Sequence, residues 1–113
     1  MQIVKGDITL GELKIASGKI FGNMVKAVVD IDRGILAIDA ELHSDLEACL
    51  LKDGSKQKDL WGINLYPELP GDDFIEFDSM INLRPSQGNR SRGVENEDIR
   101  KKITALIQKK VKR

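Results

Sequence analysis

Two short stretches of the sequence carry side chains that could do chemistry, and the first is Glu41-Leu42-His43-Ser44-Asp45. On a strand, Glu41, His43 and Asp45 would point the same way, because side chains alternate between the two faces. Two carboxylates and an imidazole could then hold a divalent ion, or shift one another's pKa values for acid–base catalysis. The alternative is structural. Glu41 would pair with Lys26 across a hairpin, and Asp45 would lie in the first turn of a helix.

The second stretch is an arginine-rich loop that follows a predicted strand. Its candidate ligand-binding residues are Arg84, Gln87, Asn89, Arg90 and Arg92, arranged around Gly88. Guanidinium and amide groups of this kind donate hydrogen bonds to phosphate or carboxylate oxygens. In the competing interpretation the loop is a solvated turn whose arginines neutralise carboxylates of the preceding strand. The sequence leaves both open.

Other familiar chemistries are poorly represented. The chain has one cysteine and one histidine, which excludes disulfide frameworks and zinc sites built from pairs of either residue. Cys49 shares an apolar stripe with Leu46 and Leu50, where a thiol packs as a small hydrophobe. Gly54-Ser55-Lys56 matches neither the serine-hydrolase elbow nor the phosphate-binding loop. We therefore expect no metal and no cofactor.

The net charge of zero conceals a division along the chain. Residues 1–83 carry 8 basic and 15 acidic side chains, a net charge of −7, whereas residues 84–113 carry 10 and 3, a net charge of +7. The basic part could bind a small anion, an acidic protein surface or a second copy of the chain, or could pair with its own acidic body. Nucleic acid is disfavoured as a partner, because only 4% of the residues are aromatic.

The sequence shows no sign of a membrane segment. Its longest apolar runs are four residues, Ile35–Ile38 and Ala48–Leu51, whereas a bilayer-spanning helix needs about 20. The first ten residues contain Lys5 and Asp7 and no apolar stretch of signal-peptide length. These observations predict a cytoplasmic protein with no membrane partner.

The 113 residues suffice for one domain, and we expect 1–113 to form it. Ile3 and Val4 predict a short strand. Thr9-Leu10-Gly11-Glu12 has the form of a capping box, which predicts a helix that ends at Gly22-Asn23.

A hairpin is the best-determined element. Alternating apolar residues over 25–32 and 35–42 predict two strands, joined by a two-residue turn at Arg33-Gly34. This turn pairs Ile31 with Leu36 and Val29 with Ile38 on an apolar face. The opposite face would be polar, with Lys26 across from Glu41.

Ser44-Asp45-Leu46-Glu47 is a second capping-box sequence, and we favour a helix over a strand for residues 45–53. Residues 60–66 and 74–84 predict two further strands, and Asn96 caps a last helix that runs to Val111. The order is β-α-β-β-α-β-β-α. It predicts an α+β domain with a mixed, mainly antiparallel sheet of about five strands and with helices packed on one face. The other face would present a polar set: Asp39, Glu41, His43, Asn64, Glu76, Asp78, Asn82 and Arg84.

From about Phe21 onward, several stretches of the sequence are familiar sequence motifs. They are Glu41-Leu42-His43-Ser44-Asp45, Asp53-Gly54-Ser55-Lys56-Gln57, Leu60-Trp61-Gly62 and Ile81-Asn82-Leu83-Arg84-Pro85-Ser86-Gln87-Gly88-Asn89-Arg90-Ser91. Together they make the chain resemble a family of small prokaryotic proteins of unknown function. The resemblance implies a compact domain and brings no activity, cofactor or partner with it.

Two functional hypotheses follow, and they leave open whether the protein is an enzyme. The first is a non-enzymatic binding or assembly module whose loop 84–92 takes an anionic ligand or an acidic partner. The alternative is a metal-assisted, phosphoesterase-like hydrolase that uses Glu41, His43 and Asp45 as ligands or base and Arg84 to hold the anion.

Overall fold

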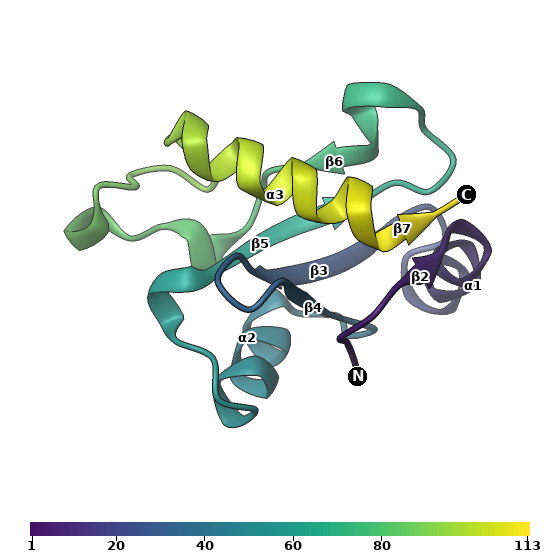
Figure 1. The fold of residues 1–113 in the computed structure, drawn as a ribbon, viewed down its shortest axis with the longest axis horizontal. Helices are drawn as coiled ribbons and strands as arrows, with labels where there is room; N and C mark the ends of the chain where they lie inside the picture. The colour runs from purple at the N-terminus through teal and green to yellow at the C-terminus, as the bar shows by residue number, and fades with distance from the viewer.

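The computed structural model describes residues 1–113 as one five-stranded antiparallel sheet with three helices (Figure 1). The sheet order is β1-β4-β3-β5-β6, and β2 and β7 form a separate parallel pair. The elements are β1 (Gln2–Val4), β2 (Ile8–Thr9), α1 (Leu10–Ile20), β3 (Val25–Asp30), β4 (Ile35–Ile38), α2 (His43–Lys52), β5 (Leu60–Leu65), β6 (Ile75–Glu76), α3 (Glu97–Lys110) and β7 (Val111–Lys112). The predicted α+β class and the five-stranded sheet are confirmed.

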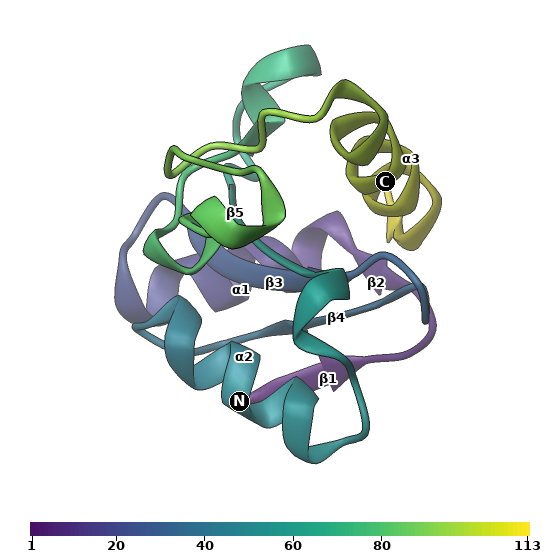
Figure 2. The ribbon, with the colours of Figure 1, turned by 90° about the vertical axis from the view of Figure 1, so that its left-hand side faces the viewer.

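The helices cover both faces of the sheet, so the prediction of helices on one face is wrong. Ala27 and Val29 of β3 pack in one cluster with side chains of α1 and α3, whereas Val28 packs in a second cluster with Leu46 and Leu50 of α2. Figure 2 shows α2 and α3 on opposite sides of the sheet. The apolar run over residues 35–38 is typical of a strand buried on both faces.

The hairpin register differs from the predicted one by two residues. Val29 pairs with Leu36 and Asp30 with Ile35, so residues 31–34 form the connection. Asp30 Oδ1 accepts the amides of Asp32 and Arg33, each at 2.9 Å, and this side-chain turn replaces two residues of strand. Because the shift is even, each side chain keeps its predicted face.

The predicted pair of Lys26 and Glu41 is absent from the sheet. Strand β4 ends at Ile38, and Asp39 has a φ of 74°, which turns the chain away before Glu41. Lys26 instead lies opposite Asn64 of β5. The predicted polar face therefore survives only in part.

The two predicted capping boxes have different outcomes. At α1, Thr9 Oγ1 accepts the amide of Glu12 at 3.0 Å and the Glu12 carboxylate accepts the amide of Thr9 at 3.1 Å, as predicted. Helix α2 is a helix, as favoured, but it begins at His43 and its N-cap is Leu42, which supplies no side-chain hydrogen bond. The box at Ser44 is wrong because that residue already lies inside the helix.

The predicted strand over residues 74–84 is also wrong, since β6 contains only Ile75 and Glu76. Beyond it, the Asn82 side chain takes the place of a neighbouring strand. Its Oδ1 accepts the Gly62 amide at 2.8 Å, and its Nδ2 donates to the Gly62 carbonyl at 2.9 Å. A side-chain amide can replace a peptide group in this way, which frees the backbone to form the 3₁₀ turn Met80–Asn82.

The last helix ties the two ends of the chain together. Asn96 Oδ1 caps α3 by accepting the amide of Ile99 at 3.0 Å, as predicted. At the other end, the buried Lys110 ammonium donates to the carbonyls of Lys5 at 3.1 Å and Gly6 at 2.7 Å. None of the helices combines the length and the apolar character needed to cross a membrane.

Candidate functional site

A cleft of about 300 Å³ lies where the start of α2 meets β3, β5 and the chain that follows β6. Its lining residues are Met24, Lys26, Leu42, His43, Ser44, Asn64, Glu76, Asp78, Ser79, Met80, Ile81 and Arg92. The cleft therefore joins members of both stretches that the sequence singled out, His43 and Arg92. Glu41, Asp45, Arg84, Gln87, Asn89 and Arg90 do not line it.

His43 is the most constrained of these side chains. It is 7% exposed, and its Nε2 lies 2.8 Å from the carbonyl oxygen of Ile63. Because a carbonyl only accepts, Nε2 carries the proton and Nδ1 is left as an acceptor. Burial lowers the pKa of His43 below its ordinary value of 6.5, and the charge of Lys26 lowers it further. His43 is therefore neutral near pH 7.

Asn64 carries an unpaired buried acceptor. The residue is 5% exposed, and its Nδ2 donates to Glu76 Oε1 at 2.8 Å and to the Asp78 carbonyl at 3.2 Å. Both partners are acceptors, so the orientation of the amide is fixed. Its Oδ1 is buried and receives no hydrogen bond. Such a group is costly in a folded protein unless a donor from outside meets it.

The start of α2 supplies the opposite polarity. The first N–H groups of a helix have no intrahelical partner, and the apolar N-cap Leu42 supplies no side-chain acceptor for them. The Leu42 carbonyl accepts the Asp45 amide at 3.2 Å, so the free N–H groups are those that precede Asp45. Lys26 and Arg92 add positive charge to the same cleft. Arg92 Nε is also bonded to Asp78 Oδ1 at 2.7 Å, in an ion pair that is about half exposed. The cleft thus presents donors at the helix end and acceptors near Asn64.

Arg84, the first residue of the arginine-rich loop, is hydrogen-bonded to the backbone of the protein. Its Nε donates to the Ile81 carbonyl at 2.9 Å and its Nη1 to the Gln57 carbonyl at 3.0 Å, while Nη2 donates to the Leu60 carbonyl. The guanidinium lies 4.7 Å from the ring centre of Trp61. The residue is 8% exposed, and burial lowers the pKa of Arg84. Its donors are directed at the protein itself.

Two other predicted ligand-binding residues of the loop, Gln87 and Asn89, also make hydrogen bonds within the protein. Gln87 Oε1 accepts from Arg84 Nη1 at 3.3 Å. Buried Asn89 donates from Nδ2 to the carbonyls of Asn82 at 2.7 Å and Gly93 at 2.8 Å, and its Oδ1 accepts the Glu95 amide at 2.9 Å.

Arg90 differs from Gln87 and Asn89 because its side chain makes no hydrogen bond within the protein. Its backbone amide donates to the Glu95 carboxylate, but its exposed guanidinium has no hydrogen-bond or ion-pair partner in the structure. Of the three loop arginines, only Arg92 reaches the cleft.

The three residues of the first stretch do not converge. Helix α2 begins at His43, so His43 and Asp45 lie about 200° apart around the helix instead of on one strand face. Glu41 and Asp45 are exposed, whereas His43 is buried. No group of three His, Cys, Asp or Glu side chains in the structure is arranged to hold a metal ion.

Sequence reasoning missed Ser79, which helps to place the wall of the cleft. The Ser79 side chain lies against Gly62 so closely that a Cβ at Gly62 would be 2.5 Å from it. A glycine within the apolar strand pattern of residues 60–65 signals such a close approach. It does not reveal which segment approaches.

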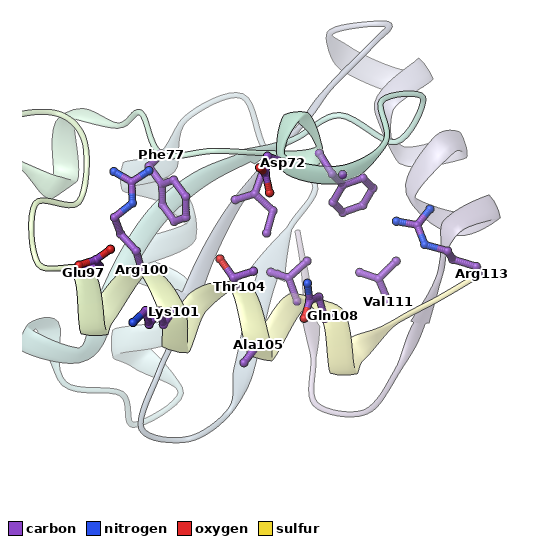
Figure 3. Close-up of a pocket in the computed structure, with 14 residues that line it drawn as sticks. Asp72, Phe77, Glu97, Arg100, Lys101, Thr104, Ala105, Gln108, Val111 and Arg113 are labelled. Atoms are coloured by element: carbon purple, nitrogen blue, oxygen red, sulfur yellow. The ribbon is translucent and has the colours of Figure 1, made fainter.

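A second, larger cavity of about 840 Å³ runs between α3 and residues 71–77 (Figure 3). Phe74, Ile75, Ile107 and Val111 supply apolar surface, and cationic side chains of α3 lie along it. It contains none of the residues that the sequence singled out for function.

The chain belongs to the family described as "Protein of unknown function (DUF5674)", which matches residues 2–110. Searches of curated proteins and of solved structures find no match. The predicted membership in a family of unknown function is confirmed. The chemistry of the two cavities is thus the basis for a functional proposal.

Proposed function

We propose that the protein is a binding module for a small ligand that carries both an anionic group and a hydrogen-bond donor, and that the 300 Å³ cleft is its site. The observation that carries this proposal is the buried, unpaired Oδ1 of Asn64 in a residue that lines the same cleft as the start of α2, which has no side-chain cap. The two features require partners of opposite character. One ligand with two different polar ends would satisfy both.

The anionic end of the ligand belongs at α2. Backbone N–H groups and the helix dipole favour a negative charge at a helix N-terminus. Lys26 and Arg92 line the same cleft and would add charge-assisted contacts to a carboxylate or phosphate. Arg92 is the contribution of loop 84–92 to this site.

The donor end belongs at Asn64. A ligand ammonium or N–H would meet the unpaired Oδ1, with the carboxylates of Glu76 and Asp78 nearby in the lining. A cleft of about 300 Å³ lies at the small end of the range for ligand pockets. These features favour an α-amino acid or another small zwitterion.

No observation favours the alternative, a metal-assisted hydrolase. It requires Glu41, His43, Asp45 and Arg84 around one reacting group, yet Glu41 and Asp45 are exposed outside the cleft and Arg84 donates to protein carbonyls.

The proposal is tested by following amide chemical shifts during separate titrations with glycine, L-serine, L-aspartate and sodium phosphate. We expect at least one amino acid to shift the amides of Ser44 and Asn64. Lys26→Gln and Arg92→Gln should each weaken this binding several-fold, because each removes a charge from the cleft.

Arg90→Gln is the matched control, since its guanidinium has no partner and lies outside the cleft. It should leave the titration unchanged. The proposal fails if none of the four probes shifts cleft resonances of the folded protein at millimolar concentration. It also fails if Arg90→Gln weakens binding as much as Arg92→Gln does.

A further inference from the structure

The basic side chains at the end of the chain have no carboxylate partners. The five ion pairs of the structure are Lys5–Asp53, Lys14–Glu68, Arg33–Asp53, Arg84–Glu47 and Arg92–Asp78. None involves residues 97–113, which carry seven lysines and arginines. The positive charge of α3 and β7 is therefore not neutralised by direct contact with the acidic body of the protein.

Part of this charge borders the 840 Å³ groove (Figure 3). Arg100 and Lys101 lie on the α3 wall near one end, and Arg113 lies at the other end. Two of these cations rest on aromatic rings. The Arg100 guanidinium is 4.5 Å from the ring centre of Phe77, and that of Arg113 is 5.4 Å from that of Phe74. Contact with a ring restrains a guanidinium and leaves its N–H donors available.

The groove also contains an unpaired strand edge. Strand β6 has β5 as its only neighbour, and Tyr66 donates to the Phe74 carbonyl at 2.9 Å across that ladder. In an antiparallel ladder, residues alternate between pointing their backbone groups at the partner and away from it. Ile75 is the next residue, so its N–H and C=O point away from β5. Ile75 is also part of the groove lining.

We propose that this groove binds an extended acidic peptide segment of another protein, which adds to the free edge of β6. Backbone hydrogen bonds would form with Ile75, and alternate side chains would reach the apolar floor. Acidic side chains would meet Arg100, Lys101 and Arg113 along the rim.

The dimensions fit a short segment. Helix α3 has 14 residues and is about 21 Å long, which corresponds to about six residues of extended chain. The carboxylates in the lining are Asp72 and Glu97, and Glu97 lies in the first turn of α3, where the helix dipole offsets its charge. The balance of the groove favours an anionic occupant.

The test uses a fluorescent seven-residue peptide with alternating glutamate and valine, and the same peptide with lysine in place of glutamate. The full chain should bind the acidic peptide and not the basic one, as measured by fluorescence anisotropy at low salt. Arg100→Gln combined with Lys101→Gln should weaken binding by about tenfold, because both charges border the groove.

Lys102→Gln combined with Lys109→Gln is the matched control, since it removes the same charge from the same helix at positions outside the groove lining. It should weaken binding less than about threefold, through long-range attraction alone. Hydrogen exchange of the Ile75 amide should slow when the acidic peptide binds. Attraction to α3 without strand addition would leave this exchange unchanged.

Five results would overturn the proposal. The first four are the absence of acidic-peptide binding by the folded chain, equal loss of binding in both double variants, unchanged exchange at Ile75, and a dimer in sedimentation that the Arg100→Gln, Lys101→Gln variant dissociates. The fourth result would assign the groove to a second copy of the chain. Competition by an oligothymidylate more strongly than by the acidic peptide would assign it to nucleic acid and would equally refute the proposal.

Discussion

The arginine-rich loop and helix α3 carry similar positive charge in the sequence but use it differently. In the loop, Arg84 donates to three backbone carbonyls and Arg92 pairs with Asp78. In α3, no lysine or arginine has a carboxylate partner. The cause is the supply of acceptors nearby. The loop packs against short 3₁₀ turns and the start of β5, where the carbonyls of Ile81, Gln57 and Leu60 can still accept from a side chain, whereas the internal carbonyls of a long helix already accept within the helix.

The number of cations in a segment therefore does not measure its capacity to bind an external anion. The unusual composition of residues 84–92 is largely explained by folding, because Arg84 and Asn89 serve as internal donors. The amphipathic pattern of α3 looks ordinary, yet its charges remain available, apart from that of Lys110, which is buried against the carbonyls of Lys5 and Gly6. The structural role of the loop arginines and the binding role of the α3 cations can be separated by variants that remove only the hydrogen bonds of the loop.

The largest effect is expected for Arg84→Met, which keeps the aliphatic bulk and removes the guanidinium. It would leave the Leu60 carbonyl without the Arg84 donor, remove one of two donors from the Gln57 carbonyl and bury Glu47 without its counter-charge. Removing one partner from a buried charged network costs about 3–5 kcal/mol. Urea unfolding should therefore show a loss of that order.

Arg100→Met is the matched control in α3. Arg100 makes one long hydrogen bond, from Nη1 to the Val94 carbonyl at 3.4 Å, and rests on Phe77. We expect it to lower the free energy of unfolding by less than about 1 kcal/mol. Equal losses in the two variants would refute the distinction between loop and helix.

A smaller effect is expected where the chain after β6 closes on β5. Gly62→Ala places a Cβ 2.5 Å from the Ser79 side chain, so either the strand or the turn must shift. Overpacking of this kind costs about 1–3 kcal/mol. Urea unfolding measures the loss.

The control for Gly62→Ala removes the Ser79 side chain, which the new Cβ would meet. The double variant Gly62→Ala, Ser79→Gly should be more stable than Gly62→Ala alone, even though Ser79→Gly removes the hydroxyl that accepts the Ile81 amide. Additive losses in the double variant would show that Ser79 is not the group that Gly62 accommodates.

The buried His43 makes the free energy of unfolding depend on pH. Because burial lowers its pKa in the folded state, the unfolded chain takes up a proton as the pH falls through 6.5, and the folded chain does so only at a lower pH. The free energy of unfolding should therefore fall as the pH falls from 7 to 5, by at most about 1.4 kcal/mol per pH unit.

His43 is the only histidine in the sequence, so His43→Gln should flatten this dependence between pH 5 and 7. Below pH 5, carboxylates titrate in both proteins, and the two curves should become parallel. An unchanged slope between pH 5 and 7 in the variant would show that another group causes it.

Sequence pattern predicted the elements that bury one clear stripe or face. Helix α3 and strand β5 lie where their apolar periodicity placed them. The hairpin strands were predicted, but their register was shifted by the Asp30 side chain, which forms a turn that apolar periodicity does not encode. The segment after Glu76 was misassigned because the Asn82 side chain imitates a strand partner.

The candidate cleft was partly visible in the sequence. His43, Asn64, Glu76 and Asp78 were placed on one polar face, and they do line one cleft. Arg84 was grouped with them, but its acceptors are backbone carbonyls, which every residue has and no motif reveals. Side-chain type predicts the polarity of a site. Which of its polar side chains remain free to contact a ligand depends on the backbone acceptors near each of them.

The smallest stability effect, and the sharpest separation within the loop, is expected for Arg90→Ala and Arg92→Ala. Arg90 has no side-chain partner, and the Arg92–Asp78 pair is 57% and 43% exposed, where an ion pair contributes less than about 1 kcal/mol. Each variant should therefore unfold within about 1 kcal/mol of the parent. The two should differ in the amino-acid titration of the cleft, because only Arg92 lines it, and the loss in Arg92→Ala should shrink as salt screens its charge. If instead the double variant Arg90→Ala, Arg92→Ala melts much earlier than the parent, Arg92 stabilises the loop as Arg84 does. The contrast with α3 then extends to every arginine of the loop except Arg90.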